Sequence, residues 1–75
     1  MAQVEVKTEV AGTVWKIVAA AGQRLEAGDP VMIIECMKME IPVVAEAAGT
    51  VAKILVAEAA LVAEGQPVAI LETPA

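Results

Sequence analysis

The chain has 75 residues and a formal net charge of −5, contains no histidine, and has Cys36 as its only cysteine. This length gives room for one domain and excludes a second, catalytic one, and no disulfide can form within the chain. The usual zinc and haem ligand sets lack their histidines, and the five basic residues are scattered. We therefore expect no metal site and no nucleic-acid partner.

The beginning of the chain, residues 1–7, alternates polar and apolar residues and is neither a signal peptide nor a transmembrane span. We therefore expect a cytoplasmic protein without a membrane partner. Because the chain opens on Met1 and ends soon after its last strand-like run, we expect residues 1–75 to form one free-standing domain, monomeric in isolation. Trp15 is the one aromatic residue, so the core should consist of small aliphatic side chains, which suit strands.

The chain contains two copies of one unit. Residues 12–17 read Gly-Thr-Val-Trp-Lys-Ile and residues 49–54 read Gly-Thr-Val-Ala-Lys-Ile. Residues 28–35 and 65–72 share the pattern Gly-x-Pro-Val-x-Ile-x-Glu, and both pairs of segments are offset by 37 positions. Shared alanine and valine richness does not place Gly, Lys, Pro and Glu in register twice, so we predict an internal repeat of residues 9–35 and 46–72.

Each copy is typical of short strands joined by tight turns, because Val- and Ile-rich runs are punctuated by Gly, Pro and Asp or Gln. Alanine-rich residues 19–21 and 58–63 favour helix by propensity alone, but they align in the repeat, and we expect tertiary packing to override that propensity. Two units, each too small to bury its apolar face alone, should pack about an approximate twofold axis. The result is a compact all-β sandwich or flattened barrel with neighbouring termini.

Two differences between the copies carry expectations. Trp15 aligns with Ala52, so the fold does not require a large aromatic ring at this position of the repeat. We therefore expect the Trp15 side chain to be half-exposed. Gly22 aligns with Ala59, from which we expect the second turn to differ in shape from the first.

The first copy runs on from Glu35, the counterpart of Glu72, through Cys36-Met37-Lys38-Met39-Glu40, a stretch that has no counterpart after the second copy. If residues 31–34 form a strand and the second unit starts near residue 43, the chain must reverse direction in between, giving a hairpin over residues 35–42. A two-residue hairpin turn needs positive φ at both central residues and prefers Asn, Asp or Gly, none of which is present. Such a disagreement between sequence and geometry indicates a functional reason.

Lys38 would present a primary amine that another enzyme can acylate, once the amine is deprotonated. The thioether side chains of Met37 and Met39 suit transient contact with a partner surface. By residue type alone, a surface lysine between two methionines of a buried strand is the favoured interpretation.

The stretch 35–40 resembles the Glu-Ala-Met-Lys-Met motif of the biotinyl and lipoyl attachment domain family, and the similarity extends over nearly the whole chain. The resemblance implies a flattened barrel, the hammerhead type, of two four-stranded antiparallel sheets with quasi-twofold symmetry. It also implies that Lys38 carries covalently attached biotin, that Met37 and Met39 are read by the ligase and by partner enzymes, and that Glu35 and Cys36 flank the motif. Cys36 stands where the family has Ala or Ser, and the thumb loop of some carriers is absent.

As the resemblance implies, the chain is a non-catalytic carrier. A biotin protein ligase would attach the biotin, which would then shuttle carboxylate between the biotin carboxylase and carboxyltransferase subunits of a biotin-dependent carboxylase. Two alternatives stay open. One is a lipoyl carrier for acyl or aminomethyl transfer, although lipoyl domains usually have Asp before the lysine and a small residue after it. The other is an unmodified β-sandwich that acts as a binding module.

Overall fold

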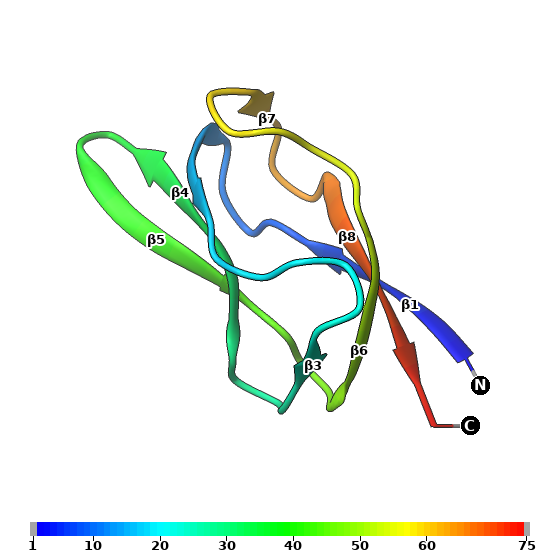
Figure 1. The fold of residues 1–75 in the computed structure, drawn as a ribbon. Helices are drawn as coiled ribbons and strands as arrows, with labels where there is room; N and C mark the ends of the chain where they lie inside the picture. The colour runs from blue at the N-terminus through cyan, green and yellow to red at the C-terminus, as the bar shows by residue number, and fades with distance from the viewer. Residues whose placement is uncertain (1, 75) are drawn as a thin grey trace.

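The computed structural model describes residues 2–74, which form eight strands and no helix. In chain order the strands are β1 (Ala2–Lys7), β2 (Gly12–Ile17), β3 (Arg24–Leu25), β4 (Pro30–Cys36), β5 (Met39–Val44), β6 (Gly49–Ile54), β7 (Leu61–Val62) and β8 (Pro67–Thr73). The all-β prediction is confirmed, and the alanine-rich segments that favour helix by propensity lie in the connections before β3 and around β7 (Figure 1).

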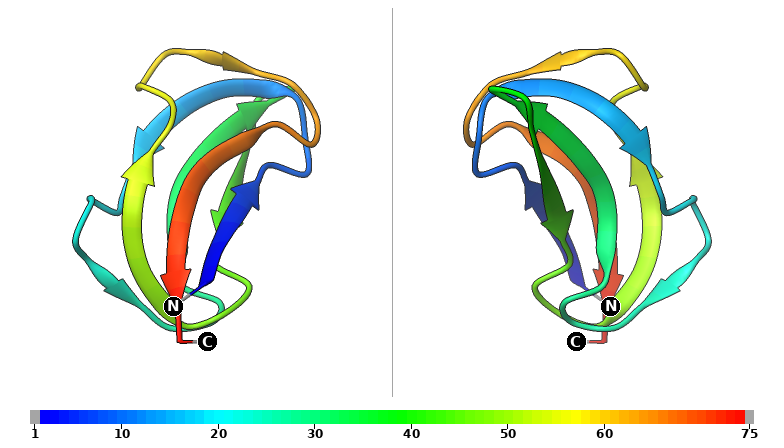
Figure 2. Two further views of the ribbon diagram at one scale, coloured as in Figure 1. Left: turned by 90° about the vertical axis from the view of Figure 1, so that its right-hand side faces the viewer. Right: turned by 90° about the vertical axis from the view of Figure 1, so that its left-hand side faces the viewer.

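The strands form two four-stranded antiparallel sheets, ordered β1-β8-β6-β3 and β5-β4-β2-β7. Each strand of one sheet has its repeat equivalent at the same place in the other sheet, which confirms the quasi-twofold symmetry. Figure 2 shows the two curved sheets facing each other, and the buried side chains of the core lie between them. The two ends of the described chain meet in one sheet, because Ala2 pairs with Thr73.

The core is aliphatic and comes equally from the two copies. In β2 and β6 the buried Val14 and Val51 stand between less buried neighbours, whereas β4 and β8 each bury two consecutive residues, Val31 with Met32 and Val68 with Ala69. The largest fully buried side chains include three equivalent pairs, Val14 with Val51, Val31 with Val68, and Ile34 with Leu71. Burying each such side chain contributes about 1.5–3 kcal/mol, and because a single cysteine permits no internal disulfide, this burial is a main source of the stability of the fold.

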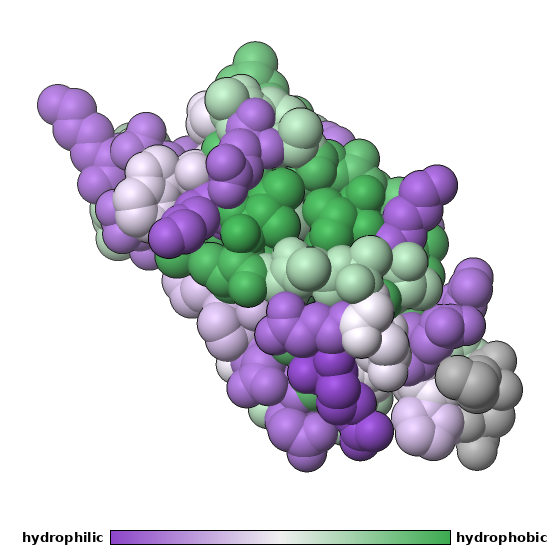
Figure 3. All heavy atoms as spheres, in the orientation of Figure 1, coloured by the Kyte–Doolittle hydropathy of each residue, from purple (hydrophilic) through white to green (hydrophobic). Residues whose placement is uncertain are grey.

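Some apolar surface remains outside the core. Figure 3 shows apolar side chains gathered over the middle of the face seen in Figure 1. Val18 and Leu55, which directly follow β2 and β6 and are equivalent in the repeat, are 38% and 39% exposed. Ile17 and Ile54 beside them are partly buried and pack against the core. These four residues therefore form a rim of the core.

Both copies carry a β-bulge at the same place. The pairing of β2 with β4 shifts between Val14 and Lys16, and the pairing of β6 with β8 shifts between Val51 and Lys53. Trp15 is the extra residue in the first copy, and it is 49% exposed, as the sequence predicts. A bulge leaves one residue unpaired and changes the direction of its side chain. The Trp15 indole can therefore point away from the sheet without displacing a buried residue.

The expectation that the turn at Ala59 differs from the turn at Gly22 is wrong. Ala59 has a φ of +72° and Gly22 a φ of +91°, so both residues are left-handed. The Gly22 N–H donates to the Val51 carbonyl at 2.7 Å, and the Ala59 N–H donates to the Val14 carbonyl at 2.7 Å. These matching hydrogen bonds between the loop and the neighbouring strand hold both turns in one shape, and they hold an alanine in a conformation that favours glycine.

Replacing Ala59 with Gly is therefore expected to stabilise the protein. Relief of the left-handed alanine should raise the free energy of unfolding by about 1 kcal/mol, since this conformation costs an L-residue roughly 1–2 kcal/mol. The midpoint of urea unfolding measures the change. Gly22→Ala is the matched control and should lose a similar amount. A loss of stability in Ala59→Gly would mean that the extra chain entropy of glycine outweighs the relief of strain.

Candidate functional site at the β4–β5 hairpin

From Met32 to the tip, β4 pairs with β5 in unbroken register, with Glu35 opposite Glu40 and Cys36 opposite Met39. The turn between them therefore has two residues, Met37 and Lys38. Their φ values are +53° and +64°, positive at both central positions, as a type I′ turn requires. Figure 1 shows the tip at the opposite end of the molecule from the start of β1 and the end of β8.

The turn is strained for its sequence. Neither Met37 nor Lys38 is a glycine or asparagine, and a left-handed conformation costs an ordinary L-residue about 1–2 kcal/mol. The pairing of β4 with β5 on both sides confines the two residues to a two-residue hairpin turn, in which both have positive φ. The side chains at the tip are thus not explained by the stability of the turn, and strain that the surrounding structure imposes is a feature of functional sites.

The tip is exposed. Met37 is 89% and Met39 63% exposed, and Lys38 also lies at the surface. The two ion pairs found within residues 2–74 join Lys7 to Glu5 and Arg24 to Glu26, so neither involves Lys38. The structure thus brings together two solvent-facing thioethers and one amine at the end of a β-ribbon.

The root of the hairpin is tightly packed. Ile34 is fully buried and paired with Ile41, four residues from the candidate lysine. Gly12 lies so close to β4 that a β-carbon there would overlap the Glu35 carbonyl oxygen and meet the Ile34 side chain. The glycine lets β2 lie directly against the hairpin, so a rigid base carries the exposed tip. The repeat aligns Gly12 with Gly49, but the sequence does not reveal this close contact.

The two flanks of the motif differ in their surroundings. Cys36 is half-buried and is cross-strand neighbour to Met39, so these two side chains share one face of the hairpin. Glu35 and Glu40 share the other face, and both are exposed. Two carboxylates directly opposite each other repel, and they give one side of the hairpin a concentrated negative charge. The sequence pattern alone does not single out Glu40, and it is the register of the two-residue turn that pairs it with Glu35.

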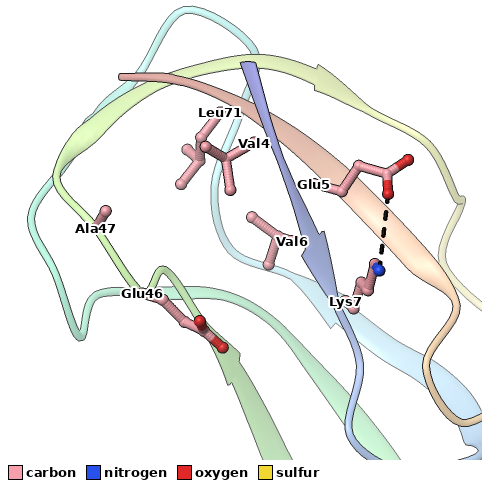
Figure 4. Close-up of a pocket in the computed structure, with 7 residues that line it drawn as sticks. All are labelled: Val4, Glu5, Val6, Lys7, Glu46, Ala47 and Leu71. Atoms are coloured by element: carbon pink, nitrogen blue, oxygen red, sulfur yellow. Dashed lines mark ion pairs between the residues drawn. The ribbon is translucent and has the colours of Figure 1, made fainter. Parts of the chain in front are cut away.

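A cavity of about 270 Å³ lies away from the hairpin tip, between β1 and the β5–β6 connection. Val4, Val6 and Leu71 turn into it with Ala47 opposite, as Figure 4 shows, and the ion pair of Glu5 with Lys7, 3.9 Å apart, lies on the other side of β1. The lining also includes Glu5, Lys7 and Glu46, but it contains no serine, cysteine or histidine that could serve as a nucleophile with a base beside it. The chemistry of the site therefore rests on the hairpin.

Residues 2–74 contain neither a metal-binding cluster nor a membrane-spanning helix. No group of three or more acidic, cysteine or histidine side chains in this range is arranged to hold a metal ion. The same range contains no helix of the length and apolarity that crossing a membrane would need.

A β-barrel that lifts an exposed lysine on a strained two-residue turn has the architecture of a prosthetic-group attachment domain. Residues 2–71 match the biotin and lipoyl family model, described as "Biotin-requiring enzyme". Because this match covers nearly the whole chain, the protein belongs to the biotin/lipoyl attachment domain family, as the motif predicts.

Relatives and solved structures agree with this family. The chain is 49% identical over 39 residues to the biotin/lipoyl attachment protein of Bacillus subtilis (strain 168), covering 52% of this chain and 53% of that protein. It is 40% identical over 40 residues to the biotinylated protein TB7.3 of Mycobacterium tuberculosis (strain ATCC 25618 / H37Rv), covering 53% and 56%. The chain thus spans about half the length of the curated relatives it matches.

The solved urea carboxylase of Kluyveromyces lactis contains a similar fold, with a TM-score of 0.91 and 42% sequence identity. The alignment covers 96% of this chain and 6% of that enzyme. Nearly the whole chain therefore corresponds to one small part of a large carboxylase.

Proposed function

We propose that the chain is a carrier that holds biotin in amide linkage on Lys38. The observation that carries this proposal is the turn itself, in which two exposed residues are held at positive φ although neither suits that conformation. The biotinylated mycobacterial relative and the fold shared with a urea carboxylase support biotin as the group and a carboxylase as the setting. An amine at the end of a rigid ribbon can enter the active site of a modifying enzyme without rearrangement of the barrel.

Each residue of the hairpin has a part in this proposal. The Lys38 amine is the nucleophile that the ligase acylates, and amide formation removes its positive charge. Met37 and Met39 offer apolar contact to the ligase and to later partners, while Glu35 and Cys36 flank them on opposite faces of the ribbon. Attached biotin supplies the carboxyl-carrying chemistry, and the domain contributes rigid presentation of Lys38.

The proposed partners follow from that role. A biotin protein ligase loads the chain, and biotin carboxylase and carboxyltransferase subunits then use it in turn, in the cytoplasm. The tether replaces two diffusive encounters with local ones and raises the effective concentration of biotin at each site. The domain itself acts as a monomer and catalyses neither step.

A lipoyl carrier is the second candidate, since the family serves both groups. The exposed Met37 and Met39 favour biotin, because lipoyl domains usually carry Asp before the lysine and a small residue after it. The experiment below separates the two groups.

The test is the intact mass of the purified protein after incubation with a biotin protein ligase, ATP and biotin. We expect one added biotinoyl group on the wild-type protein and on Lys53→Arg, which changes an exposed lysine of β6, and none on Lys38→Arg. A lipoyl adduct with a lipoyl ligase, and no biotin adduct, would assign the chain to the lipoyl branch. Labelling of Lys38→Arg to the wild-type extent would contradict the assignment to Lys38.

A further inference from the structure

A hollow of about 340 Å³, open to solvent, lies on the outer face of the β5-β4-β2-β7 sheet. Because Val14 and Ile34 point into the core, their strand neighbours Thr13, Trp15 and Glu35 face outward. The hollow is lined by Thr13, Val14, Trp15, Glu35, Glu58 and Ala59. It combines an aromatic wall with a hydroxyl and two carboxylates.

Backbone hydrogen bonds hold the walls of this hollow in place. The Val14 N–H donates to the Ala60 carbonyl at 2.8 Å, and the Ala59 N–H donates to the Val14 carbonyl at 2.7 Å. Glu58 Oε2 accepts a hydrogen bond from the Ile17 N–H at 3.1 Å. The β6–β7 connection is thus fastened along β2, and the bulge at Trp15 turns the indole outward beside it. The hollow is therefore formed before any ligand arrives.

The hollow lies within reach of a group carried on Lys38. Glu35 precedes Lys38 by three residues on β4, a distance of about 10 Å along a strand. Thr13 is directly paired with Glu35 on β2, and Trp15 follows two residues further from the tip. The lysyl side chain and the valeryl chain of biotin together extend about 14 Å at ordinary bond lengths, and the ring adds to this reach. The arm can therefore fold back so that its ring meets the Trp15 hollow.

The chemistry of the lining matches a biotin ring. Biotin carries two ureido N–H donors, one ureido carbonyl and a thioether. Neither the Thr13 hydroxyl nor the Glu35 carboxylate takes part in the side-chain hydrogen bonds and ion pairs of residues 2–74. Glu35 can accept from the ureido N–H groups, and Thr13 can donate to the carbonyl. The exposed face of Trp15 can cover the ring and its sulfur.

We propose that the Trp15 hollow is a resting site for the biotin ring of the same chain, an inference that rests on the proposed attachment at Lys38. The ring leaves the hollow when a partner enzyme binds the ring. The affinity of the hollow for the ring therefore sets the fraction of carrier molecules whose ring is free to enter a partner's active site. A short tether gives an effective concentration on the order of millimolar. A dissociation constant of about one millimolar for the ring would therefore fill the hollow about half of the time.

The test uses Trp15 as its own reporter, because it is the only aromatic residue. Intact mass first establishes complete biotinylation. Acrylamide quenching of Trp15 fluorescence is then compared between the biotinylated and unmodified protein, and we expect the quenching constant to fall about twofold on modification. Added free biotin at the protein concentration should leave the unmodified protein unchanged, since the effect depends on the tether. Thr13→Val, which keeps the side-chain volume, should return part of the lost quenching.

Amide and indole NMR shifts give an independent measurement on the same samples. On biotinylation we expect shifts at the Trp15 indole N–H and at the amides of Thr13, Glu58 and Ala59, in addition to those of the turn. Unchanged quenching, with shifts confined to residues 36–40 of a fully biotinylated protein, would overturn the resting site and leave the carrier function standing. An unmodified mass would overturn both.

Discussion

The double variant Met37→Asn, Lys38→Gly is expected to be more stable than the wild-type protein and to be refused by biotin ligase. Asn-Gly is the preferred pair for a turn with positive φ at both central residues, whereas Met37 and Lys38 occupy that turn at φ +53° and +64°. Removing two left-handed L-residues should raise the free energy of unfolding by about 1–3 kcal/mol. For a domain of this size, each kcal/mol corresponds to roughly 4–8 °C in Tm.

The matched control is Met37→Asn alone, which retains the lysine. It should gain about half of the stability and still accept biotin, at a rate that reports the contribution of the Met37 thioether. Thermal unfolding and initial labelling rates measure the two effects side by side. If the double variant is less stable than the wild-type protein, the turn is not strained, and the functional argument from its φ values fails.

Ile34→Ala is expected to have the largest destabilising effect near the hairpin. Ile34 is fully buried at the root of β4, between the core and the tip. Truncating such a side chain removes its transfer free energy and leaves a cavity, at a cost of about 2–5 kcal/mol. In a small domain this is a large part of the total stability, and the urea midpoint should fall accordingly.

Two controls separate stability from presentation of the lysine. Leu71→Ala truncates the repeat equivalent of Ile34 on β8, and it should cost a similar amount without touching the root of the hairpin. Val44→Ala, at a side chain 39% exposed, should change stability much less. Under conditions in which all variants are folded, we expect slower biotinylation only in Ile34→Ala. Equal labelling rates for Ile34→Ala and Leu71→Ala would show that the ligase does not require a rigid root.

The hairpin could be predicted from the sequence because one stretch of the first copy is missing from the second. Strands at residues 12–17 and 28–35 have partners 37 positions later, whereas the residues around Lys38 have none. A stretch without a counterpart, placed where the chain must reverse, predicts a tip. The absence of turn-forming residues there then predicts the strain that the φ values confirm.

Other features depend on interactions that sequence does not display. The bulge at Trp15 is invisible in the repeat because the second copy has one at the same place, so the alignment needs no gap. The left-handed Ala59 results from a hydrogen bond to Val14, which overrides the preference of alanine. The Glu35–Glu40 pair follows from cross-strand register, and the Trp15 hollow from a loop fastened beside β2. Each of these depends on contacts between segments distant in sequence.

The measurement that tests the central claim most directly is a tryptic map of the protein after labelling by biotin ligase. Trypsin does not cleave after an acylated lysine, so biotin on Lys38 should join residues 25–53 into one peptide that carries a single biotinoyl group, located on Lys38 by fragmentation. The unlabelled protein should yield residues 25–38 and 39–53 separately. Biotin found on Lys7, Lys16 or Lys53, with cleavage after Lys38 intact, would contradict the account.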